Sequence, residues 1–255
     1  MTKIIAIANQ KGGVGKTTTT INLATALCSI GKRVLVIDLD PQANASTGLG
    51  IDYNKRKINI YDLLVNEKYT NNSIKKTIIP TLDIIPATTD LAAAEIEFVS
   101  LDGRESRLKK ILNEIIEYDN IMIDCPPALG LLTINGLVAS DSVIIPLQCE
   151  FFALEGLSSL IHTIQSIQKS FNHNLKIQGV VLTMFDKRNS LSTLVEKDVR
   201  KHLGKTVYST VIPRNVRVSE APSHGKPVLI YDVGCPGSKA YIDLAKEVIE
   251  QQKDN

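Results

Sequence analysis

The sequence predicts a doubly wound α/β fold, a mainly parallel sheet with helices on both faces. Short runs rich in Ile and Val recur along the chain, and nearly every residue within each run is apolar. Strands that are buried on both faces have this character, whereas strands of a half-exposed sheet alternate between apolar and polar residues. Stretches with helical periodicity separate the runs, and this alternation is typical of strand–helix–strand units.

The strands are expected, in chain order, at residues 4–8, 34–37, 82–85, 121–123, 143–146, 180–182, 210–212 and 228–230. Helices are expected at about residues 17–30, 105–117, 131–139, 154–171, 191–203 and 238–251. The sequence contains no linker rich in Pro, Ser or Gly that interrupts this alternation. Residues 1–255 are therefore predicted to form a single domain.

The composition excludes several classes of protein. Of the 255 residues, 44% are hydrophobic and 22% are charged, unlike a disordered, collagen-like or coiled-coil chain. No apolar stretch approaches the roughly 18 residues of a membrane span, and no signal peptide is recognisable. The four cysteines, at positions 28, 125, 149 and 235, fit neither a zinc motif nor a disulfide framework. A cytoplasmic protein is therefore expected.

The net charge of +2 is an average over regions of opposite sign. Residues 1–57 carry eight basic and three acidic side chains, and residues 186–227 carry nine and four. Residues 58–185, in contrast, carry nine basic and fifteen acidic side chains. The small total argues against a strongly basic nucleic-acid binder, but the two basic blocks leave a local anion-binding surface open.

Residues 11–17, with the sequence KGGVGKT, lie between the first predicted strand and the first predicted helix. Glycines in such a loop remove the Cβ atoms that would hold an anion away from the backbone amides, and the helix N-terminus attracts the same anion. Lys16 is expected to contact the β- and γ-phosphates of a nucleotide, and the Thr17 hydroxyl to bind Mg²⁺. The usual motif has glycine where this chain has Gln10, and Lys11 is an addition to it.

Two other predicted strands end in carboxylates. The second continues into the sequence DLD, with Asp38 and Asp40, and the fourth ends in Asp124, followed by the sequence CPP. Open α/β sheets bind ligands at the carboxyl ends of their strands, where these side chains are expected. An apolar strand that ends in Asp is the Walker B arrangement, in which the carboxylate holds Mg²⁺ through water. The alternative for Asp38 and Asp40 is that each caps a turn.

The loop sequence KGGVGKTT resembles the deviant phosphate loop of the ParA/MinD group of P-loop ATPases, and the resemblance covers essentially the whole chain. It implies a nucleotide-sandwich dimer that binds ATP and Mg²⁺. The loop residues that would bind ATP are Lys11, Gly12, Gly13, Val14, Gly15, Lys16, Thr17 and Thr18. In this group the additional lysine, here Lys11, reaches the phosphates held by the partner, where a second cation offsets charge that develops during transfer.

The resemblance also implies roles for residues outside the loop. Asp40 would position the attacking water and so would complete a catalytic set with the two loop lysines. Asp124 would hold Mg²⁺ through water, with Asp38 near the Mg²⁺ shell. Pro213 and Asn215 would contact adenine, because an Asn side chain can both donate to and accept from a base edge. A simple turn is the alternative for this last segment.

The stretch PRNVRVSEAPSHGKP at residues 213–227, together with TMFDKR at residues 183–188, resembles the chromosomal ParA, or Soj, branch of the group. There Arg188 and Arg217 correspond to residues that bind double-stranded DNA without sequence preference, and both lie in the second basic block. Arginine–phosphate contacts give affinity without sequence information and weaken steeply with salt. Four more basic residues are candidates to extend the patch, with a solvated helix face as the alternative: Lys187, Lys197, Arg200 and Lys201.

The resemblance implies a cycle for chromosome segregation. ATP-bound dimers would coat the nucleoid, and a centromere-bound ParB partner would stimulate their weak ATP hydrolysis and release them. No N-terminal operator-binding extension is expected, because the first strand follows closely on Met1. Residues 245–255 are polar and slightly acidic, unlike the membrane-targeting helix of MinD-type proteins, so no membrane partner is expected. The alternatives are a ParA-like ATPase that positions a non-DNA cargo and, less favoured, a MinD-like membrane-cycling regulator.

Overall fold

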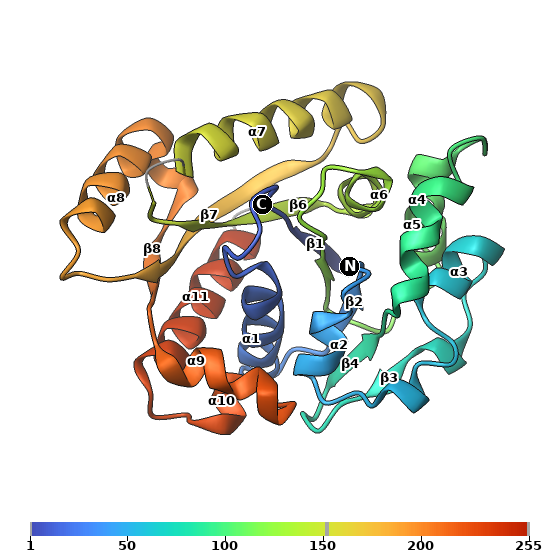
Figure 1. The fold of residues 1–255 in the computed structure, drawn as a ribbon, viewed down its shortest axis with the longest axis horizontal. Coiled ribbons are helices and arrows are strands. Elements are labelled where there is room, and N and C mark those ends of the chain that lie inside the picture. The colour runs from blue at the N-terminus through green and yellow to red at the C-terminus, as the bar shows by residue number, and fades with distance from the viewer. Residues whose placement is uncertain (1, 151–152, 254–255) are drawn as a thin grey trace.

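The computed structural model describes residues 2–150 and 153–253, which form an eight-stranded sheet with helices on both faces (Figure 1). The strand order is β3-β4-β2-β5-β1-β6-β7-β8. All neighbouring strands pair in parallel except β3 and β4. The predicted doubly wound α/β fold with a mainly parallel sheet is confirmed.

The strands are β1 (Lys3–Ile7), β2 (Val34–Asp38), β3 (Lys75–Lys76), β4 (Leu82–Ile85), β5 (Asn120–Asp124), β6 (Ser142–Gln148), β7 (Lys176–Phe185) and β8 (Val207–Pro213). The first seven predicted strands are confirmed, with shifted ends. The predicted strand over residues 228–230 is wrong, because this segment is helix α10 (Val228–Tyr231). A run of three apolar residues cannot distinguish helix from strand. Here the Val228 amide donates to Oδ1 of Asn22 at 2.7 Å and takes no part in a sheet.

Five of the predicted helices are present as α1 (Lys16–Ser29), α6 (Leu131–Ala139), α7 (Ala153–Ser170), α8 (Ser190–Leu203) and α11 (Pro236–Lys253). The predicted helix over residues 105–117 is shorter, since α5 (Arg107–Leu112) follows a 3₁₀ turn. Four other short helices were not predicted: α2 (Asn44–Gly48), α3 (Ile60–Asn66), α4 (Ala94–Glu97) and α9 (Val216–Glu220). Their four to seven residues hold too little of the periodic pattern.

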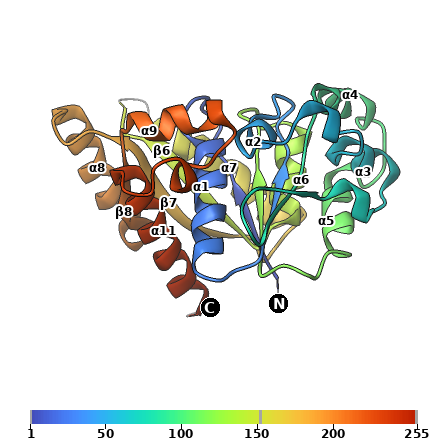
Figure 2. The same cartoon turned by 90° about the horizontal axis from the view of Figure 1, so that it is seen from below.

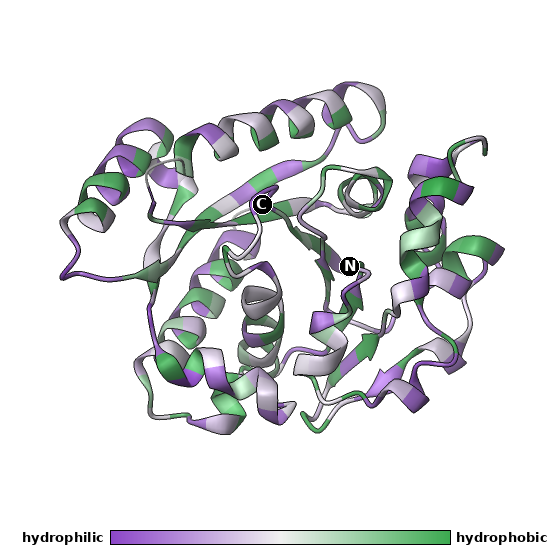
Figure 3. Cartoon of the chain, viewed as in Figure 1, coloured by the Kyte–Doolittle hydropathy of each residue, from purple (hydrophilic) through white to green (hydrophobic). Residues whose placement is uncertain are grey.

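Two hydrophobic layers enclose the sheet. On one face α1, α10 and α11 pack against strand residues that include Ile5 and Val36. On the other face α3 to α8 pack against strand residues that include Ala6 and Leu35. The strands and the helix faces that cover them are mostly apolar, whereas the outer faces of helices such as α7 and α8 are polar (Figure 3). Burial on both faces explains why the strands read as continuous apolar runs.

The carboxyl ends of the parallel strands meet at one edge of the sheet. Figure 2 shows α2, α4 and α9 along this edge, with both chain ends toward the opposite edge. Strand β1 lies between β5 and β6, so the loop that follows it emerges at the middle of the sheet. Asp38 at the end of β2 is the register partner of Asp124 at the end of β5. The fold therefore brings these two carboxylates together beside the β1 loop.

Candidate functional site

The loop between β1 and α1 forms a cradle of backbone groups. Gly13 and Gly15 have φ of +73° and +88°, which glycine adopts without strain. Apart from the glycine itself and its two neighbours in the chain, no described atom lies within 4 Å of the place where a Cβ of Gly12 or Gly13 would stand. Gly15 is the N-cap of α1 and has no side chain, so it makes no side-chain cap hydrogen bond to the first-turn amides. The cradle is therefore open to an anion and fits the phosphates predicted for it.

Lys16, the first residue of α1, turns back across the cradle. Its Nζ donates to the backbone carbonyl of Lys11 at 3.0 Å, and the residue is buried. Burial lowers the pKa of Lys16, while the negative charges of Asp124 and Asp40 act in the opposite direction. An ammonium group in this position gains from an anionic phosphate oxygen the ion pair that a neutral carbonyl cannot supply.

Asn9, which was not predicted as a site residue, fixes the start of the loop. Its Oδ1 accepts from the backbone amide of Lys11 at 3.0 Å, and its Nδ2 donates to the carbonyl of Pro146 on β6 at 2.8 Å. The side chain of Lys11 leaves the cradle, and its Nζ lies 2.5 Å from Oε2 of Glu150. A polar residue directly after an apolar strand is the one signal for Asn9, and it is too common to be specific.

The side chains of Asp38 and Asp124 are fully buried, and the pKa of each carboxyl group is raised above its ordinary value. Burial is the larger cause for each, and the proximity of other carboxylates adds to it. Ser46 of α2 satisfies Oδ2 of Asp38 through its amide at 2.8 Å and its hydroxyl at 2.6 Å. Thr20 of α1 donates to Oδ1 of Asp124 at 3.0 Å, and the Thr17 hydroxyl also favours the ionised form of Asp124. Oδ2 of Asp124 has no hydrogen-bond partner among the described residues.

Asp40 lies in the segment that joins β2 to α2. Its Oδ1 accepts from the amide of Gln42 at 2.9 Å, so it caps a turn, which was the structural alternative. Its charge also helps to raise the pKa of both Asp38 and Asp124 and supports the charged form of Lys16. The structure therefore brings Asp40 into the same cluster, as predicted.

The donor set fits a magnesium ion that is shared with a nucleotide. Asp40 and Asp124 act on the ammonium of Lys16, and Asp38 lies beside them, so a bound cation would favour the ionised forms of these three carboxyl groups. The open Oδ2 of Asp124 is an oxygen ligand of the kind that Mg²⁺ prefers, directly or through water. Within residues 2–150 and 153–253 no three or more His, Cys, Asp or Glu side chains are arranged to hold a metal by themselves. Phosphate oxygens and water would therefore have to complete the coordination.

A cavity of about 390 Å³ adjoins the cradle on the side of β7 and β8. Gly15 and Thr18 line one end of it, and Pro213 and Asn215 line the other. Asn215 is the N-cap of α9 and accepts from the amide of Val218 at 3.3 Å, so its side-chain oxygen is engaged. The loop and residues 213–215 thus line one cavity, and the contact of Pro213 and Asn215 with adenine stays a prediction. Met184, which was not predicted, also lines the cavity with φ of +50°.

The two arginines assigned to DNA both lie near the edge where β7 and β8 end. Arg188 follows β7 with its side chain 89% exposed, and it pairs with Asp186 through bonds of 3.0 and 2.8 Å. This pairing lowers the pKa of Asp186 to about 2. Arg217, on α9, pairs with Glu220 at 3.0 Å and lies 3.6 Å from Asp232. Both guanidinium groups are held by carboxylates of the same chain, and their contact with DNA stays a prediction.

The residues proposed to extend this patch do not behave alike. Lys187 lines an open hollow with Arg188, together with Arg214 and Lys239. Arg200, in contrast, bonds Glu196 at 2.9 Å and donates to the backbone carbonyl of Tyr208 at 3.0 Å. Arg200 therefore connects α8 to β8, which neither the DNA interpretation nor the solvated-face alternative predicted.

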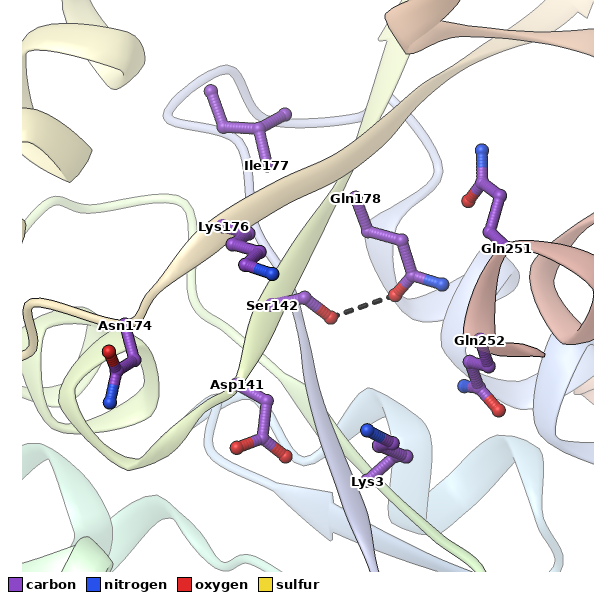
Figure 4. A pocket seen from close by; sticks show the side chains of 9 residues that line it. All are labelled: Lys3, Asp141, Ser142, Asn174, Lys176, Ile177, Gln178, Gln251 and Gln252. Atoms are coloured by element: carbon purple, nitrogen blue, oxygen red, sulfur yellow. Dashed lines mark hydrogen bonds between the residues drawn. The ribbon is translucent and has the colours of Figure 1, made fainter. Parts of the chain in front are cut away.

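A second cavity, of about 460 Å³, lies at the opposite edge of the sheet, where β1, β6 and β7 begin (Figure 4). Lys3, Asp141 and Lys176 line it together with several amide side chains, and Ser142 donates to Gln178 at 2.8 Å. The amide of Ile4 already engages Asp141 at 2.8 Å. Strand β1 is common to this cavity and the phosphate cradle, but the two lie at its opposite ends.

Within the described part of the chain, no helix has the length and apolar character to cross a membrane.

An open glycine cradle after the central strand, a lysine at the start of the next helix, and an aspartate at the end of the adjacent strand define a P-loop nucleotide-binding protein. Comparisons with known proteins agree. The AAA_31 family, described as an AAA domain, matches residues 2–177. The chain belongs to the ParA/MinD family of deviant Walker A ATPases, so the predicted resemblance is confirmed.

Relatives of this chain come from several bacteria. It is 56% identical over 255 residues to the chromosome partitioning protein ParA of Caulobacter vibrioides, with 99% of this chain and 96% of the relative covered. It is 57% identical over 249 residues to the sporulation initiation inhibitor protein Soj of Bacillus subtilis, with 97% and 98% covered. A crystal structure of cobyrinic acid a,c-diamide synthase from Mycobacterium smegmatis, with bound ADP and magnesium, has a TM-score of 0.88 at 35% identity. That comparison covers 99% of this chain and 96% of the other.

Proposed function

We propose that this chain is a chromosome-partitioning ATPase that hydrolyses ATP to ADP and phosphate. ATP would hold two copies together as a dimer on nucleoid DNA, and a ParB-type centromere-binding protein would stimulate a weak intrinsic turnover and so release the dimer. The name of the Caulobacter relative, chromosome partitioning protein ParA, supports a role in partitioning. The observation that carries the ATPase is the open cradle, with buried Lys16 facing an Asp124 whose Oδ2 lacks a described partner.

Each residue of the site has a separate role in ATP hydrolysis. The amides of residues 12–18 and the ammonium of Lys16 bind the phosphate oxygens and counter the charge that develops during transfer. Bound Mg²⁺ supplies neutralisation of the β- and γ-phosphate charge. Thr17 would hold it directly and Asp124 through water, with Asp38 behind them. Asp40, in the connection from β2 to α2, orients the attacking water.

Lys11 is the residue that links hydrolysis to the dimer. Its side chain points out of its own cradle toward Glu150, and it is 38% exposed. A second copy that packs against this edge of the sheet would bring its bound phosphates within reach of the Lys11 side chain. The ion pair with Glu150 is half exposed and weak, so release of Lys11 costs little.

DNA binding rests on Arg188 and Arg217. Their exposure at the edge where the nucleotide site lies supports a surface that two copies share once ATP joins them. Two weak patches on one dimer bind with far higher affinity than either alone, so the nucleotide state gates retention on DNA. Such a protein is expected in the cytoplasm, on the nucleoid.

The experiment measures phosphate release, sedimentation and DNA binding for the same protein samples. We expect ATP, and not ADP, to produce a dimer that retains random-sequence duplex DNA at about 50–100 mM salt. Asp40→Ala should bind ATP and dimerise but release phosphate slowly, whereas Lys16→Ala should fail to bind ATP. Retention of anionic liposomes in place of DNA would favour a membrane-cycling regulator. A dimer that retains neither would contradict the DNA step and favour another cargo.

A further inference from the structure

The N-terminus of helix α6 is capped by a residue from a distant part of the chain. Glu95, on α4, accepts a hydrogen bond from the amide of Leu131 at 2.8 Å and another from the amide of Leu132 at 3.1 Å. The two oxygens of its carboxylate therefore satisfy the first two amides of the helix. A negative charge at a helix N-terminus is also favoured by the helix dipole.

Gly130, immediately before α6, is adapted to this contact. Its φ of −85° and ψ of −168° are extended values that any residue adopts, so the backbone does not require glycine there. A Cβ at Gly130 would instead lie 2.6 and 2.8 Å from the two carboxylate oxygens of Glu95. An alanine at this position would therefore push the carboxylate at the end of the flexible Glu95 side chain away from the amides.

The contact fixes the segment that directly follows the site aspartate. Asp124 ends β5, and residues 125–130 join it to α6. The amide of Cys125 donates to Ile7 on β1 at 3.2 Å, and buried Thr133 of α6 donates to the carbonyl of Ala128 at 2.6 Å. One end of the segment is thus tied to the strand before the cradle and the other to the first turn of α6. Glu95 then ties that turn to α4, which lies beside it in the fold (Figure 1).

We propose that Glu95 is a positioning residue for ATP hydrolysis, which acts by holding the segment 125–130 in place through the α6 N-terminus and without contact with the nucleotide. The inference rests on the proposed ATPase function. Misplacement of a catalytic group by about 1 Å can cost roughly a hundredfold in rate, so a loosened segment slows turnover while the cradle still binds ATP. The expected signature is a loss of kcat at unchanged affinity for ATP.

The chain offers two routes to break the contact and a matched control. Glu95→Ala removes the carboxylate, and Gly130→Ala leaves it in place but displaces it from the amides. Glu95→Gln keeps the length of the side chain and one acceptor oxygen. The control is Glu97→Ala on the same helix, because Glu97 accepts instead from the Tyr61 hydroxyl at 2.7 Å, toward α3.

The test combines phosphate release, binding of a fluorescent ATP analogue and hydrogen exchange at Leu131 and Leu132. We expect Glu95→Ala and Gly130→Ala each to lower kcat at least about tenfold, with the affinity for the analogue within about twofold of wild type. The double variant should be no slower than either single one, and both amides should exchange faster. Glu95→Gln should have an intermediate kcat, and Glu97→Ala should match wild type.

Different failures have different meanings. A wild-type kcat in both alanine variants, despite faster exchange at Leu131 and Leu132, would reduce the contact to a helix cap and overturn the inference. An equal loss of ATP affinity and kcat would overturn it as well. A wild-type chain that binds ATP but releases no phosphate would overturn the proposed function and the inference together. If Glu95→Ala does not fold, Glu95→Gln and Gly130→Ala provide the same comparison.

Discussion

The ammonium group of Lys11 lies 2.5 Å from the carboxylate of Glu150 in the same chain. Gln148 also donates to this carboxylate at 2.6 Å, so Glu150 is held from two sides. The side chains of Lys11 and Glu150 remain 38% and 48% exposed, and pairs of this kind contribute about 0–1 kcal/mol. In a single copy, the lysine that is proposed to reach the partner's phosphates is therefore held by a weak ion pair within its own chain.

Glu150→Gln should release Lys11 and strengthen the ATP-dependent dimer. Each surface pair contributes at most about 1 kcal/mol and a symmetric dimer contains two of them, so the dimer dissociation constant should fall no more than about thirtyfold. Analytical ultracentrifugation with a non-hydrolysable ATP analogue at low salt measures it. The control is Glu155→Gln, an exposed acidic residue near the start of α7. A weaker dimer in Glu150→Gln would mean that Glu150 serves the dimer itself.

Asp124→Asn should weaken the magnesium dependence of nucleotide binding. The wild-type affinity for an ATP analogue should fall at least about tenfold when EDTA removes Mg²⁺, because the open Oδ2 loses the cation that offsets its charge. In Asp124→Asn the two affinities should differ much less. Isothermal titration with and without EDTA gives both numbers. Asp90→Asn, in an exposed turn, should behave as wild type, and an equally large EDTA effect in Asp124→Asn would remove Asp124 from the magnesium site.

Arg188→Ala and Arg217→Ala should each weaken DNA binding and flatten its salt dependence. Each variant removes two arginine–phosphate bonds from a dimer, so the magnitude of the slope of log K against log salt should fall by about 1.8. Fluorescence anisotropy with a random duplex at several salt concentrations measures the slope. Lys109→Ala is the control, since α5 lies on the opposite side of the molecule from α8 (Figure 1). An unchanged slope in both arginine variants would exclude them from the DNA surface.

Asp186→Asn should have the opposite effect on DNA. Asp186 forms two hydrogen bonds with the Arg188 guanidinium, so a phosphate must compete with this carboxylate for the same donors. Removal of the competitor and of one negative charge should tighten DNA binding about two- to fivefold at low salt. The same anisotropy titration measures it, with Asp198→Asn on α8 as a charge-matched control. Equal tightening in both variants would indicate a general charge effect.

Tyr208→Phe and Gly179→Ala should change stability in opposite directions. Tyr208 is 2% exposed, and its hydroxyl has no hydrogen-bond partner among the described residues. Loss of that hydroxyl should leave the free energy of unfolding unchanged or raise it by up to about 1 kcal/mol. A Cβ at Gly179 would lie 2.4 Å from the Tyr208 ring, so Gly179→Ala should cost about 1–3 kcal/mol. Urea unfolding measures both, and a destabilised Tyr208→Phe would show that the hydroxyl has an unseen partner.

The layered fold was predictable because parallel strands that are buried on both faces appear in the sequence as continuous apolar runs. The error at residues 228–230 has the same origin, since an apolar run marks burial and does not specify strand. Short helices such as α4 were not predictable, because they are stabilised by contacts between distant residues. The bonds of Glu95 to the α6 amides are one example.

The candidate site was predictable where a side chain follows a strand or lies in the glycine loop. The cluster of Lys16, Asp38, Asp40 and Asp124 follows from parallel strands that end at one edge. Glu150 was not predictable as the partner of Lys11, because no local pattern relates positions so far apart. Arg200 lies within a basic block, but its guanidinium bonds the backbone carbonyl of Tyr208 and so holds α8 to β8.

The cradle and the cavity beside it come from opposite ends of the chain. The residues of the cradle lie within the first 18, although Pro146 on β6 anchors Asn9 at its start, whereas the cavity requires Pro213 and Asn215 at the end of β8. During synthesis, most of the polypeptide must therefore leave the ribosome before the cradle and the cavity can lie side by side.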